Sequence, residues 1–105
     1  MVHNRETFRN ILIKALPEGN QNLYFQPPAG FKMNFPCIIY SEIMPNMIKA
    51  NNMNYITTKQ YRITVIDRNP DTQIPDKIVE NFKMCRILDR SIIDNLYHIY
   101  LEIYF

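Results

Sequence analysis

Residues 84–105, MCRILDRSIIDNLYHIYLEIYF, hold the clearest structural pattern in this chain of 105 residues. From Leu96 onward the side chains alternate between two kinds, which is typical of a β-strand with two different faces. The side chains expected to face a core are Tyr97, Ile99, Leu101, Ile103 and Phe105. The opposite face carries Leu96, His98, Tyr100, Glu102 and Tyr104. This second face is aromatic and half polar, so it suits a surface covered by another protein, or one that lies beneath a helix.

The residues just before this strand predict a neighbouring one. Residues 84–90 form a short strand pattern, with Cys85 and Ile87 on one face and Met84 and Leu88 on the other. The pair Asp94-Asn95 is a turn signal between the two strands.

Two amphipathic stretches predict helices. Residues 4–16 have helical period, with Asn4 as N-cap. The apolar stripe of this helix is Phe8, Ile11, Leu12, Ala15 and Leu16. Residues 72–82 predict a second helix that Asp71 can cap, with Pro75 tolerated in the first turn. Its apolar stripe is Ile74, Ile78 and Phe82.

Three further stretches predict strands. They are a short edge strand at 22–26, a strand at 36–42 and a long alternating strand at 54–67. Together these elements predict an α+β fold over residues 1–105, as one domain. We expect one mainly antiparallel sheet packed by two helices on one face.

The stretch IMPNMIKANNMN at residues 43–54 has no clean period and is rich in methionine, which suits adaptable contact surfaces. It leads into a strand whose first half is polar on both faces. We therefore interpret residues 43–60 as an arm that reaches a neighbouring subunit or another protein, although Met47 and Ile48 could equally pack on the core. The interface residues predicted on this basis are Met44, Met47, Ile48, Met53, Tyr55 and Lys59.

Composition gives little support to several function classes. The net charge of +2 comes from mixed charges without a basic stripe, so sequence-specific nucleic-acid binding is not expected. Cys37 and Cys85 lie in apolar runs without a metal-ligand spacing, so we expect buried, reduced thiols and no metal. No run is long enough to span a membrane, and the opening residues do not resemble a signal peptide. We therefore expect a cytosolic product without a membrane partner.

The sequence predicts no catalytic residue and no cofactor. His3 lies near the terminus, His98 lies on a strand, and a chain with two glycines lacks a phosphate-binding loop. Five acidic residues near two turns weakly resemble a metal-dependent nuclease pattern: Asp67, Asp71, Asp76, Asp89 and Asp94. Structural roles explain them better, because Asp71 can cap a helix, Asp94 can form a turn, and the Asp67-Arg68 and Asp89-Arg90 pairs can join neighbouring strands.

Several motifs resemble those of small tail terminator proteins of long-tailed bacteriophages. In the first half these are Tyr24-Phe25-Gln26-Pro27-Pro28, Gly30-Phe31-Lys32-Met33 and Pro36-Cys37-Ile38-Ile39-Tyr40. In the second half they are Asp67-Arg68-Asn69-Pro70-Asp71, Ile74-Pro75-Asp76-Lys77, Cys85-Arg86-Ile87-Leu88-Asp89-Arg90, Asp94-Asn95-Leu96-Tyr97-His98 and Tyr104-Phe105. Leu88 and Tyr97 depart from the family pattern, which tends to have an aromatic and a polar residue there. The signature residues taken from this match are Asp67, Arg68, Pro70, Asp71, Asp89, Arg90, Asn95 and His98.

The resemblance implies a structural protein of the virion neck, made in the host cytoplasm, and not an enzyme. Such proteins form a homo-oligomeric ring, expected to be a hexamer, on the head-proximal end of the tail tube. The ring stops polymerisation of the tail tube protein and docks the tail to the head connector, and DNA can pass through it. The alternatives are another neck component, such as a head-closure or connector-adaptor protein, and the nuclease already described.

Overall fold

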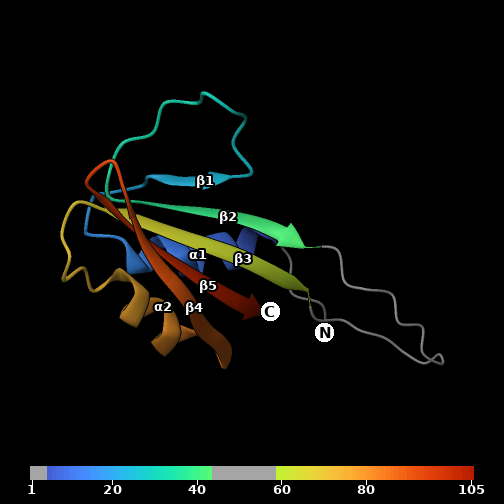
Figure 1. The fold of residues 1–105 in the computed structure, drawn as a ribbon. Helices are drawn as coiled ribbons and strands as arrows, with labels where there is room; N and C mark the ends of the chain where they lie inside the picture. The colour runs from blue at the N-terminus through green and yellow to red at the C-terminus, as the bar shows by residue number, and fades with distance from the viewer. Residues whose placement is uncertain (1–4, 44–58) are drawn as a thin grey trace, which may run out of the picture.

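A computed structural model describes residues 5–43 and 59–105, and within them it shows a five-stranded sheet and two helices (Figure 1). In chain order the elements are α1 (Arg5–Ala15), β1 (Leu23–Phe25), β2 (Cys37–Ile43), β3 (Gln60–Asp67), α2 (Ile74–Asn81), β4 (Met84–Ile93) and β5 (Leu96–Tyr104). The strand order in the sheet is β1-β2-β3-β5-β4. The pair β1–β2 is parallel and the other three pairs are antiparallel, so the α+β class and the mainly antiparallel sheet are confirmed.

Both helices pack on the same face of the sheet. The buried residues of α1 and the buried residues at α2 join one hydrophobic cluster. The sheet contributes alternate residues of its central strands to this cluster: Ile38, Tyr40, Tyr61, Ile63, Val65, Ile99, Leu101 and Ile103. The predicted stripes of both helices are thus confirmed. The idea that the second helix covers the face of Tyr100 and Glu102 is wrong, because these residues alternate with the cluster residues along β5.

The prediction that Asp71 caps the second helix is also wrong. Helix α2 begins at Ile74 with Gln73 in the N-cap position, and the Gln73 side chain makes no capping hydrogen bond. The backbone N–H of Ile74 donates to Thr72 Oγ1 at 3.4 Å. Pro75 fixes this start, because proline lacks an N–H and is tolerated in the first turn. The backbone N–H of Asp71 instead donates to Asn69 Oδ1 at 2.9 Å, so Asp71 belongs to the preceding turn.

Strand β4 is longer than the predicted 84–90 and continues to Ile93. Its register with β5 shifts between Ile87 and Asp89, which leaves Leu88 as an extra residue in a β-bulge. The bulge changes which side chains share a face, so the sequence alternation ends at Leu88 although the strand does not.

The predicted turn at Asp94-Asn95 is confirmed. Both residues have positive φ, 53° for Asp94 and 64° for Asn95, as a two-residue type I′ hairpin turn requires. Asn and Asp tolerate this conformation better than other residues with a side chain. The turn joins β4 to β5 and sets Ile93 opposite Leu96.

The remaining strand predictions agree with the structure where it describes them. The short strand predicted at 22–26 is β1, and it lies at one edge of the sheet. Strand β3 begins at Gln60. Residues 44–58 lie outside the described residues, and this range holds most of the predicted arm.

Candidate functional site

The outer edge of β4 is the most exposed apolar part of the described sheet. β4 is the last strand in the sheet order and has ten residues, whereas β1 at the opposite edge has three. Large exposed apolar side chains of β4 are Met84, Ile87, Leu88, Ile92 and Ile93, with Ile92 64% exposed. Long edge strands with apolar side chains pair readily with other chains, and native proteins usually cover or disrupt them. The bulge at Leu88 and the charges of β4 limit uncontrolled pairing here.

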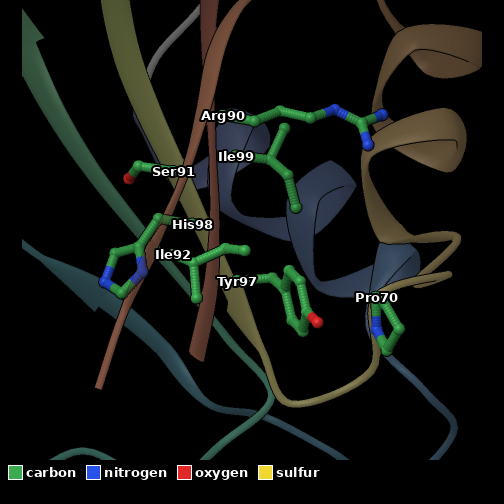
Figure 2. Close-up of a pocket in the computed structure, with 7 residues that line it drawn as sticks. All are labelled: Pro70, Arg90, Ser91, Ile92, Tyr97, His98 and Ile99. Atoms are coloured by element: carbon green, nitrogen blue, oxygen red, sulfur yellow. The ribbon is translucent and has the colours of Figure 1, made fainter. Parts of the chain in front are cut away.

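A pocket of about 460 Å³ lies where the β4–β5 hairpin meets the connection between β3 and α2. Its lining residues are Pro70, Arg90, Ser91, Ile92, Tyr97, His98 and Ile99. Figure 2 shows Tyr97 turned toward Pro70, Arg90 extended toward α2, and Ser91 and His98 on the opposite side of the hairpin. The lining is largely apolar and includes the guanidinium of Arg90. The pocket therefore suits an apolar group that lies next to a negatively charged group of the same ligand.

The structure brings three of the family-signature residues together at this pocket, namely Pro70, Arg90 and His98. His98 Nδ1 lies 3.2 Å from the backbone oxygen of Leu96, so this ring is held within its own hairpin. Asn95 is in the adjoining turn.

The other signature residues have local structural contacts. The backbone N–H of Asn69 donates to Asp67 Oδ1 at 3.1 Å, which stabilises the turn after β3. Arg68 lies over the ring of Phe35 at 5.6 Å from its centroid, in cation–π geometry. Asp89 Oδ1 accepts from the backbone N–H of Arg90 at 2.7 Å.

The prediction that the Asp67-Arg68 and Asp89-Arg90 pairs join neighbouring strands is wrong. β3 and β4 are not neighbours, because β5 lies between them. Among the described residues the ion pairs are Lys59–Glu42 and Arg86–Glu102.

Glu102 lies on the face of the sheet opposite the two helices, and it is buried, with 7% of its surface exposed. Arg86 Nε donates to Glu102 Oε1 at 3.0 Å, Gln60 Nε2 donates to Oε2, and the Tyr104 hydroxyl donates at 3.4 Å. The hydrogen bond from Arg86 is the main cause that lowers the pKa of Glu102, and its positive charge and the other two donors add to this effect. The carboxylate is therefore ionised and occupied, which suits a structural role better than proton transfer.

Of the six predicted interface residues, Lys59 is the one within the described part of the chain. Met44, Met47, Ile48, Met53 and Tyr55 lie outside the described residues. The backbone groups of Lys59 and Phe105 exchange two hydrogen bonds of 2.9 and 2.8 Å, and Lys59 Nζ lies 3.8 Å from Glu42 Oε2. The backbone and the side chain of Lys59 thus both make contacts within its own chain.

Sequence reasoning missed the exposed apolar residues at the end of β4 and the row of charged side chains that crosses β3, β5 and β4. A signal was present in the Ser91-Ile92-Ile93 run, where two isoleucines precede a turn. Arg62 and Arg86 lie on either side of Glu102 in one row across β3, β5 and β4.

Within residues 5–43 and 59–105, no group of three potential metal-ligating side chains is found, and no helix is long and apolar enough to span a membrane. Both cysteines are free; Cys37 is buried as predicted, whereas Cys85 is half-buried. Comparisons with protein-family models, with curated proteins and with solved structures find no match.

Proposed function

We propose that this chain is a structural subunit of a bacteriophage neck, and specifically a tail terminator. In this proposal identical copies form a ring, expected to be a hexamer, that caps the head-proximal end of the tail tube. The ring stops addition of tail tube protein and offers a docking surface to the head connector. It acts by surface complementarity, without making or breaking a covalent bond.

The observation that carries the proposal is the apolar outer edge of β4. Met84 and Ile92 are 59% and 64% exposed on a ten-residue strand without a described neighbour on that side. Such an edge is a feature of proteins that assemble with other chains. The motif resemblance from Tyr24 to Phe105 supports the choice of the tail terminator family among assembly proteins.

The test combines a measurement of the mass of the protein in solution with an assay of tail tube polymerisation. Native mass spectrometry over a range of concentrations should detect a closed ring of identical copies. Added to polymerising tail tube protein, the chain should shorten the tubes in proportion to its concentration and should be seen at one tube end by electron microscopy. A chain that stays monomeric and leaves tube length unchanged would overturn the proposal.

The same assay separates the alternative neck proteins. A ring that binds the head connector but leaves tube length unchanged would identify a connector-adaptor or head-closure protein. The clustering of Pro70, Arg90 and His98 around one pocket gives a variant for this comparison. Because the pocket is at the surface, Arg90→Gln should change docking without loss of the fold.

A further inference from the structure

We draw no further inference here: the strongest candidate, the surface cleft that continues the hairpin pocket along residues 70–76, is lined by Arg90 together with Asp71 and Asp76, and nothing in the structure shows what ligand or partner covers it.

Discussion

Replacing Phe8 by alanine should be the most damaging single change in α1. Phe8 is 0% exposed, stacks on Tyr61 at a centroid distance of 4.0 Å, and lies 5.3 Å from Phe82 and 5.2 Å from Phe105. Removing a buried phenylalanine side chain costs about 3–5 kcal/mol, because apolar burial is lost and a cavity remains. For a chain of 105 residues, about 4 kcal/mol corresponds to a fall in melting temperature of about 18 °C. A domain of this size has about 5–15 kcal/mol in total, so the variant should fold only marginally.

The assay is urea unfolding followed by circular dichroism, with two comparison variants. Phe31→Ala removes an exposed phenylalanine, 45% exposed, and should cost less than about 1 kcal/mol. Phe8→Leu keeps an apolar side chain but loses the aromatic pairs, so it should fall between the two at about 1–2 kcal/mol. If Phe8→Ala is within about 1 kcal/mol of Phe31→Ala, the central position of Phe8 in the core is refuted.

Three further predictions concern the sheet and its thiols. Because the Arg86 hydrogen bond lowers the pKa of Glu102, the stabilisation from Glu102 is complete above the ordinary glutamate pKa of about 4.5 and is lost as pH falls through the lowered value. Glu102→Gln should therefore flatten the acid side of a stability–pH curve from urea unfolding, and an unchanged curve would contradict this. Asn95→Gly should keep the melting temperature, whereas Asn95→Val should cost about 1–2 kcal/mol because valine resists positive φ, and equal melting temperatures would contradict the turn assignment. Burial raises the pKa of the Cys37 and Cys85 thiols to about 11, so both should react slowly with a thiol reagent at pH 8 and quickly in denaturant. Immediate reaction of the native protein would contradict their burial.

The sequence predicted the helices and the central strands because their patterns are local. The alternation from Tyr97 to Phe105 assigned the core face of β5, and the structure buries Ile99, Leu101 and Ile103 on that face. The predicted boundaries of helices and strands were wrong where a single residue changed the local geometry. Leu88 enters a bulge and ends the period of β4, and Pro75 moves the start of α2 beyond the reach of Asp71.

The candidate site was harder to predict, because it depends on which strands become neighbours. β4 follows β3 in the chain but pairs with β5 alone among the described strands, so its apolar side chains are left at an edge. The pocket forms because the connection at Pro70 returns beside Tyr97, a contact between residues far apart in the sequence. Neither the edge nor the pocket leaves a periodic signal in one segment. The position of Asn95, in contrast, was predictable because a turn is encoded by adjacent residues.

Mutations in the predicted arm should separate ring formation from folding. A closed ring needs two different surfaces on each copy, and the proposed function uses the apolar edge of β4 as one of them. If the predicted arm supplies the second, Ile48→Asp should reduce the ring to smaller species, because an unpaired charge in a buried contact is costly. Asn54→Asp adds the same charge at a polar position of the same segment, so it should keep the ring in native mass spectrometry. A ring that survives Ile48→Asp would show that the arm is not a ring contact.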